Sequence, residues 1–159
     1  QHVCNAPNDK QQLEPTVASI SPVIGRVSEV LADSGYYSEK AVTTVEEGEN
    51  GPMVYTAMKR HGHGRSIEQL EKREDPAAPP LGAPVPEVMA HRLETKEGKD
   101  LYAKRKEAVE PVFGIIKGAL GFHRFQLRGL EKVNLEWTLM TTSYNLKRLF
   151  NLGMRLKGA

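Results

Sequence analysis

A proline- and glycine-rich segment in the middle of the chain restricts the fold more than any other feature. It begins with the basic run Arg60-His61-Gly-His63-Gly-Arg65 and continues with acidic residues among five prolines, the last of which is Pro86. A stretch of this composition cannot form a compact core, so we expect residues 60–88 to be a linker or a loosely ordered insertion. His61 and His63 could ligate a metal, but they lack a partner at suitable spacing, which favours a solvated or phosphate-contacting loop.

The part before this segment, residues 1–59, alternates short apolar runs with helical patterns. Val27–Asp33 and Pro52–Ala57 are apolar runs bounded by turn residues, which is typical of buried strands, and the second is expected to be central in its sheet or close to the centre. Helices are expected from Leu13, after a cap at Asn8 or Asp9, and from Ser38 to Val45. This alternation predicts a mixed α/β layer.

The part after the segment, residues 89–159, is expected to be mainly helical. Its last helix has the clearest pattern, because apolar residues recur at spacings of three and four. This apolar stripe is interpreted as core, and it consists of Leu130, Val133, Trp137, Met140 and Tyr144, extended by Leu146, Leu149 and Phe150. Before it, residues 118–129 are expected to form a loop that alternates aromatic with basic side chains.

The net charge of +2 hides an uneven distribution along the chain. Residues 101–159 carry 11 Lys and Arg against 4 Asp and Glu, which gives +7, whereas residues 1–100 carry 11 against 16, which gives −5. A basic C-terminal part suits a polyanionic partner, although solubility alone could also produce it. Cys4 is the only cysteine, and no apolar run reaches the length of a membrane span, so we expect a cytoplasmic protein. The chain begins with Gln1 rather than methionine, from which we expect a fragment.

Two acidic residues stand out by their surroundings. Asp33 directly follows the first predicted strand, where functional groups gather in α/β folds, although an acid there can equally well begin a turn. Glu110 lies between the basic residues Arg105 and Lys117 on a predicted amphipathic helix, with Tyr102 upstream. A carboxylate flanked by cations suits metal-assisted chemistry on a polyanion, because the carboxylate can hold a divalent ion while the cations hold phosphates. The alternative interpretation is an amphipathic helix with a solvated charged face.

Several sequence blocks, taken in order, carry a family resemblance. They are LADSGYYS at residues 31–38, Tyr102-x-x-Arg105, VEPVFG at residues 109–114 with Lys117, RFQLRGLEKV at residues 124–133, and Tyr144-Asn145-Leu146. In this order the chain resembles the C-terminal part of a bacterial insertion-sequence transposase of the DDE type. The first block alone would be weak, and the resemblance is poorest over residues 60–88.

This resemblance implies a partial ribonuclease H-like fold, with residues 1–59 as the second half of its α/β catalytic core. In this fold three carboxylates hold two divalent ions, usually Mg²⁺. The ions promote in-line attack of water or a DNA 3′-hydroxyl on a phosphodiester. Asp33 matches the second carboxylate of the family and Glu110 the third. The implied partners are transposon-end DNA and, in the intact protein, a second copy of the chain, at the bacterial nucleoid. The residues expected to bind DNA are Tyr102, Arg105, Lys106, Lys117, Arg124 and Arg128, with Lys106 standing where the best-known signature has its arginine.

The chain departs from the family at the first aspartate, which lies upstream of Gln1 in the family. Asp9 is the only acid before Glu14 and occupies an expected helix cap, so no catalytic role is assigned to it. We therefore expect a transposase fragment that is inactive alone. The alternatives are a nucleic-acid-binding remnant without catalysis, which the +7 charge of residues 101–159 favours, and a small helical protein without a nucleic-acid role.

Overall fold

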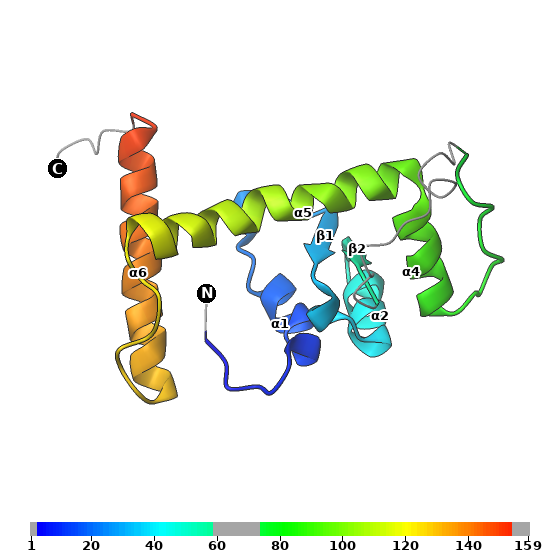
Figure 1. Ribbon diagram of the computed structural model, residues 1–159. Helices are drawn as coiled ribbons and strands as arrows, with labels where there is room; N and C mark the ends of the chain where they lie inside the picture. The colour runs from blue at the N-terminus through cyan, green and yellow to red at the C-terminus, as the bar shows by residue number, and fades with distance from the viewer. Residues whose placement is uncertain (1–2, 59–73, 154–159) are drawn as a thin grey trace. The chain divides into compact units, whose positions relative to one another are not determined.

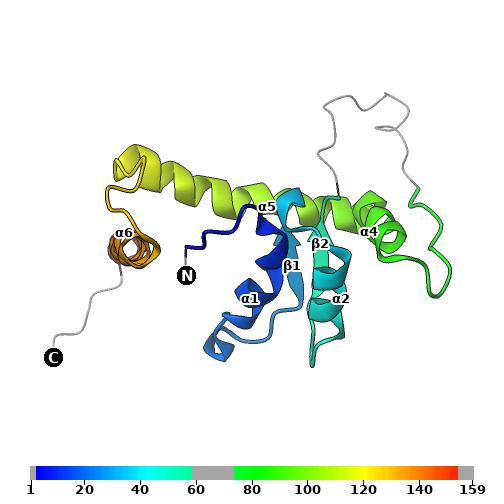
Figure 2. The same cartoon turned by 90° about the horizontal axis from the view of Figure 1, so that it is seen from below.

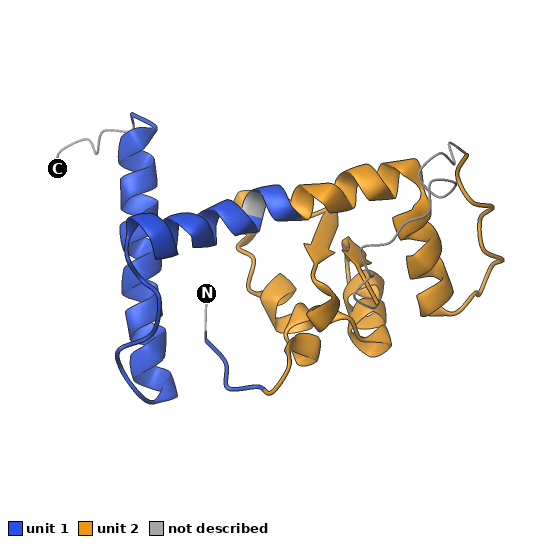
Figure 3. Cartoon of the chain, in the orientation of Figure 1, with its two compact units in different colours: residues 1–6, 106–159 blue, residues 7–105 orange. Residues whose placement is uncertain are grey.

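The computed structural model describes residues 3–58 and 74–153, which belong to two compact units (Figure 3). The strand unit comprises the described residues within 7–105, and the helical unit comprises those within 1–6 and 106–159. His61 and His63 lie outside the described residues, as do the other residues of 60–73 in the predicted insertion. The three-part organisation with boundaries after residues 59 and 88 stays a prediction.

The strand unit contains a two-stranded parallel sheet. β1 (Glu29–Ala32) pairs with β2 (Met53–Thr56), and α2 (Glu39–Glu47) forms the connection between them (Figure 1). Parallel neighbouring strands need a crossover of this kind, because the chain must return to the end of the sheet where the first strand began before the second strand can start. Both predicted strands are confirmed, and so is the α/β class. The ribonuclease H-like topology stays a prediction.

Short helical elements surround this sheet. The chain forms η1 (Asp9–Gln11), α1 (Leu13–Ala18), η2 (Pro22–Ile24) and η3 (Ser34–Tyr36) before α2, and α4 (Val85–Glu94) follows the sheet. The Asn8 side chain caps η1 by accepting a hydrogen bond from the Lys10 amide at 3.2 Å, as the sequence predicts. α1 begins at the predicted residue, and it accommodates Pro15 in its first turn. The backbone N–H that proline lacks would have no intrahelical partner there.

One apolar cluster forms the core of the strand unit. Leu13, Val42, Val45, Val54 and Met89 are buried and in mutual contact, so that α1, α2, β2 and α4 meet at one place. Val17, which follows Leu13 by one turn of α1, is partly buried and packs against this cluster. β1 contributes less than predicted, since its residues are only half-buried or exposed. The core is therefore built around β2 rather than equally around both strands.

The outer edge of β2 is covered by two charged side chains instead of a third strand. The Glu46 carboxylate of α2 accepts a hydrogen bond from the Val54 amide at 2.8 Å, and the Arg92 guanidinium of α4 donates to the Val54 carbonyl. Arg92 also pairs with Glu46 and lies 5.5 Å from the centre of the Tyr55 ring. The expectation that β2 is central is therefore wrong for the described residues, in which β2 pairs only with β1. Side chains satisfy the backbone groups that a neighbouring strand would otherwise bind.

A close approach fixes the junction between α4 and α5 (Lys96–Gly114). The two helices are separated only by Thr95, whose hydroxyl donates to the Arg92 carbonyl at 2.9 Å and accepts from the Gly98 amide at 3.0 Å. A Cβ atom at Gly98 would lie only 1.8 Å from the Arg92 carbonyl oxygen, so this position requires glycine. The helical interruption therefore falls at Thr95, and Gly98 allows the first turn of α5 to lie close to the end of α4.

The helical unit contains the end of α5, the π-helix η4 (Ile115–Ala119) and α6 (Leu130–Asn151). α5 continues past Pro111, although proline cannot donate the hydrogen bond that an interior position normally supplies. The pattern changes from α to π four residues later. The predicted loop is confirmed from Leu120 to Gly129, and α6 begins at the predicted residue.

The apolar stripe predicted for α6 is only partly buried. Trp137 packs with three phenylalanine rings, with centroid distances of 6.1 Å to Phe113, 6.3 Å to Phe122 and 6.2 Å to Phe125. By contrast, side chains at both ends of the stripe are exposed in the described structure, namely Leu130, Leu146, Leu149 and Phe150. Their interpretation as core is therefore wrong for the described residues. No helix in the described part of the chain combines the length and apolar character needed to cross a membrane.

Candidate functional site

Asp33 lies directly after the carboxyl end of β1, in the place that the sequence predicts. Its carboxylate accepts a hydrogen bond from the Ser34 amide at 2.7 Å and thereby caps η3. Its backbone carbonyl accepts a hydrogen bond from the Thr56 hydroxyl at 2.9 Å, which ties the turn to the end of β2. The side chain remains 63% exposed. The turn interpretation and the functional interpretation of this residue are thus compatible, because one oxygen organises the turn while the group faces solvent.

Tyr102 connects α5 to the ends of both strands. Its hydroxyl donates to the carbonyl of Ala32, the last residue of β1, at 3.2 Å, and it accepts from the amide of Ala57, just after β2, at 3.4 Å. One side chain therefore bridges the two strand ends. In the ribbon, this part of α5 passes the ends of β1 and β2 (Figure 2). The carboxyl edge of a parallel sheet is where α/β proteins commonly place their binding residues.

Arg105 lies one helical turn beyond Tyr102 and faces Asp33. Its Nη1 atom is 3.3 Å from Asp33 Oδ1, and its guanidinium carbon is 5.3 Å from the centre of the Tyr102 ring. Its Nε atom is buried and has no hydrogen-bond partner among the described residues. Because Asp33 is largely exposed, solvent screens this ion pair, and we expect it to add little to stability. The structure thus brings Asp33, Tyr102 and Arg105 together.

The remaining predicted residues of α5 belong to the helical unit. Glu110 is exposed, as is Lys106 one turn earlier on the same helix, and Lys117 is exposed on η4. A lysine four residues before a glutamate lies on the same helical face, so Lys106 and Glu110 present opposite charges side by side. Asp33 belongs to the strand unit, whereas Glu110 belongs to the helical unit.

The loop of residues 120–129 carries the other two predicted DNA-binding residues. Arg124 and Arg128 are both exposed. Between them, the amides of Gln126 and Leu127 donate to the carboxylate of Glu136, a residue of α6, at 2.8–3.1 Å and 3.0 Å. Sequence reasoning did not single out Glu136. Its position next to Trp137 and behind a glycine-bounded loop is visible in the sequence, but a helical glutamate normally indicates only a solvated face.

The described residues do not complete a metal site. No group of three or more His, Cys, Asp or Glu side chains in the described ranges could hold a metal ion. Asp33 directs one carboxylate oxygen to Ser34 and Arg105 instead. Asp9 lies close to the turn after Asp33, since a Cβ atom at Gly35 would be 3.4 Å from Asp9 Oδ2. Asp9 and Asp33 together supply only two carboxylates. The donor set therefore falls short of the three carboxylates that the resemblance implies.

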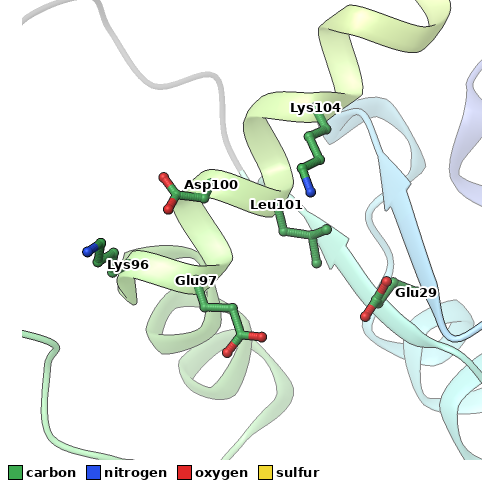
Figure 4. A pocket seen from close by; sticks show the side chains of 6 residues that line it. All are labelled: Glu29, Lys96, Glu97, Asp100, Leu101 and Lys104. Carbon is green, nitrogen blue, oxygen red and sulfur yellow. The ribbon is translucent and has the colours of Figure 1, made fainter.

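A separate hollow of about 540 Å³ lies between β1 and the first turns of α5 (Figure 4). Both acidic and basic side chains line it, which leaves it without a dominant charge: Glu29, Lys96, Glu97, Asp100, Leu101 and Lys104. None of the residues predicted to be functional lines this hollow. We therefore place the candidate site at the carboxyl ends of the strands, where Asp33, Tyr102 and Arg105 meet.

Comparison with known proteins gives one family match. The family model described as "Transposase DDE domain" matches residues 83–150. This range contains α4, α5 and all but the last residue of α6, and so includes Tyr102, Arg105, Glu110 and Glu136. Comparisons with curated proteins and with solved structures gave no match. The match confirms the resemblance deduced from the ordered sequence blocks and supports a transposase-type function. Residues 83–150 of this chain are therefore similar to transposase DDE domains.

Proposed function

We propose that this chain is part of a DNA transposase that cleaves phosphodiester bonds and transfers strands at the ends of a bacterial insertion sequence. The observation that carries the proposal is the match to the transposase DDE domain over residues 83–150, which include the predicted carboxylate Glu110. The exposed cations Lys106 and Lys117 on either side of Glu110 support it, because a carboxylate among cations suits a phosphodiester substrate.

In this proposal Asp33 and Glu110 are two of the carboxylates of the intact enzyme, with Mg²⁺ as the expected ion. Carboxylate oxygens are the ligands that Mg²⁺ prefers. Since no group of three candidate ligands occurs among the described residues, no catalytic step is assigned to them. The contact between Tyr102 and the strand ends supports a binding role for this surface, as it fixes α5 beside Asp33.

We further propose that the 159-residue polypeptide binds DNA but does not cleave it. The test incubates the purified chain with supercoiled plasmid and Mg²⁺ and measures nicking, while fluorescence anisotropy measures binding to a labelled duplex. The matched variants are Asp33→Asn and Glu110→Gln, which remove a charge without changing side-chain size. We expect DNA binding by all three proteins and nicking by none.

Two outcomes would contradict parts of this proposal. Mg²⁺-dependent nicking that both substitutions abolish would overturn the inactivity of the polypeptide and establish Asp33 and Glu110 as catalytic. Failure of the unsubstituted chain to bind DNA would overturn the nucleic-acid role itself. Sedimentation of the chain with and without DNA tests the homodimer that the family resemblance implies.

The second candidate function is nucleic-acid binding without any catalytic role. The pairing of Asp33 with Arg105 favours it, because the guanidinium takes up an oxygen that a metal would need. Reading the DNA upstream of the Gln1 codon, in frame, separates the two candidates. A frame that continues into a strand bearing an aspartate supports the transposase, and a chain extended by that segment should gain Mg²⁺-dependent nicking. A stop codon supports the non-catalytic protein.

A further inference from the structure

We propose that Glu136 is a positioning residue, which holds the loop of residues 120–129 in the conformation that presents Arg124 and Arg128 to the DNA backbone. This inference rests on the proposed function, because it assigns the way in which one surface of the same chain recognises DNA. It concerns a residue that touches neither strand ends nor predicted carboxylates. All of the contacts that support it lie within the helical unit.

The carboxylate of Glu136 binds the middle of the loop. The Gln126 amide donates to both of its oxygens, at 2.8 and 3.1 Å, and the Leu127 amide donates to Oε2 at 3.0 Å. Successive backbone amides that point at one anion form a nest, and bonds of this kind to a charged acceptor are about twice as strong as neutral ones. The two arginines flank this nest in the sequence. These hydrogen bonds therefore fix the backbone segment that lies between the two arginines.

The neighbouring residue of α6 holds the loop through apolar contact. Trp137 contacts the rings of Phe122 and Phe125, which also contact each other edge to face at a centroid distance of 5.4 Å. The loop is bounded by Gly121 and Gly129, which adopt φ angles of +68° and +91°, in the region that favours glycine. Consecutive residues of one helix therefore attach the loop by a polar and an apolar contact. Such a loop presents its charged side chains in a defined direction.

The chemistry of the exposed side chains selects the ligand. No acidic residue occurs between Glu110 and Glu131, whereas Arg124 and Arg128 are exposed on the loop. Arginine binds phosphate oxygens in a bidentate manner and makes many of the backbone contacts that position proteins on a duplex. Sequence-tolerant contact with DNA phosphates is therefore the interaction that this loop supports.

A purely electrostatic effect and a positioning role predict opposite changes in DNA affinity for the substitution Glu136→Gln. Glu136→Gln removes a negative charge near the arginines, so electrostatics alone predicts tighter DNA binding. If Glu136 positions the loop, the same substitution weakens binding, because an amide nitrogen replaces an acceptor of the two backbone amides. The matched control is Glu131→Gln, which removes an equal charge from an exposed residue near the start of α6.

The experiment measures anisotropy of a labelled random-sequence duplex with the full chain at several salt concentrations. We expect Glu131→Gln to bind as tightly as the unsubstituted chain or slightly more tightly. We expect Glu136→Gln to bind several-fold more weakly, with the slope of log Kd against log salt reduced by about 1 for each phosphate that the variant no longer neutralises. Amide hydrogen exchange at Gln126 and Leu127 should accelerate in Glu136→Gln and stay unchanged in Glu131→Gln.

A second variant keeps the inference testable if Glu136→Gln folds poorly, as judged by circular dichroism. Glu136→Asp retains the charge but withdraws the carboxylate from the amides, so only positioning predicts weaker binding. Binding by the Glu136 variants that equals that of the Glu131→Gln control would overturn the inference while leaving the proposed function intact. Absence of binding by the unsubstituted chain would instead contradict the proposed function.

Discussion

At the scale of single residues, Tyr102 illustrates how a motif position acquires its role from its surroundings. The resemblance implies a DNA contact, but the hydroxyl of Tyr102 lies between the Ala32 carbonyl and the Ala57 amide. We predict that Tyr102→Phe lowers the free energy of unfolding by about 1–2 kcal/mol, because two backbone groups lose a partner. Urea unfolding measures this change. DNA affinity that falls while stability stays unchanged would show instead that the hydroxyl binds DNA directly.

Tyr37 is the opposite case, a hydroxyl without a partner. Its oxygen is buried and has no hydrogen bond among the described residues, and burial, followed by the nearby Glu39 carboxylate, raises the pKa of Tyr37 above its usual value of 10.0. We predict that Tyr37→Phe leaves the free energy of unfolding unchanged or raises it by up to about 1 kcal/mol. The substitution breaks no hydrogen bond, and it removes a buried polar atom. A decrease in stability in thermal unfolding would mean that the hydroxyl is satisfied in solution.

The same substitution should change the response of stability to alkaline pH. With a pKa that is higher in the folded than in the unfolded chain, Tyr37 retains its proton longer when folded, so its contribution is constant below about pH 10 and declines as the pH rises toward the folded pKa. Above about pH 10 the Tyr37→Phe variant should therefore lose less stability than the unsubstituted chain. Tyr55, whose pKa is also raised by burial, leaves a residual decline in both proteins.

At the scale of elements, the edge of β2 shows a dependence that residue patterns do not reveal. The Glu46–Arg92 pair is partly buried, with side chains 28% and 15% exposed, and both partners bind Val54. We predict that Arg92→Met lowers the free energy of unfolding by about 1–3 kcal/mol, because the Val54 carbonyl and the Glu46 carboxylate both lose a donor. Arg105→Met serves as control, since its exposed pair with Asp33 should contribute less than about 1 kcal/mol.

A double-mutant cycle tests whether these two side chains act as one unit. Glu46→Gln and Arg92→Met should not be additive, and a coupling energy of about 0.5–3 kcal/mol is expected for residues in one hydrogen-bond network. Additive effects would mean that each side chain supports β2 separately. In either case the measurement reports on an edge that the described residues leave without a third strand.

The elements that sequence reasoning predicted correctly are those with strong local causes. Asn8 caps η1, Leu13 begins α1, and the runs before Asp33 and around Val54 form strands, because capping, helical spacing and β-branched content act within a few residues. The position of β2 at an edge could not be predicted, because it depends on Glu46 and Arg92, which come from two different helices. The course of α5 past Pro111 likewise ran against the local preference of proline.

The candidate site was predictable to the same extent. The ordered blocks located Asp33, Tyr102 and Arg105, and the structure brings these three together. They did not indicate that Arg105 would pair with Asp33, since that ion pair joins residues far apart in the sequence. Glu136 was missed for the same reason, because its role depends on loop amides that no helical pattern encodes.

At the scale of the whole molecule, charge distribution matters more than net charge. The chain carries only +2, yet residues 101–159 carry +7. We predict that neutralising Lys106 and Lys117 to Gln weakens DNA binding and lowers the salt slope by about 0.9 for each phosphate that a lysine had neutralised. Neutralising Lys10 and Lys40, which are also exposed but lie in the strand unit, should leave both quantities nearly unchanged.

Both double variants change the net charge by the same amount, so their comparison isolates the location of the charge. Anisotropy titrations of one labelled duplex across a range of salt concentrations give the affinity and the slope together. Equal decreases in affinity in the two variants would mean that DNA responds to the overall charge of the protein. A decrease confined to the Lys106 and Lys117 variant would mean that DNA lies along the helical segment that carries Glu110, where the transposase proposal requires it.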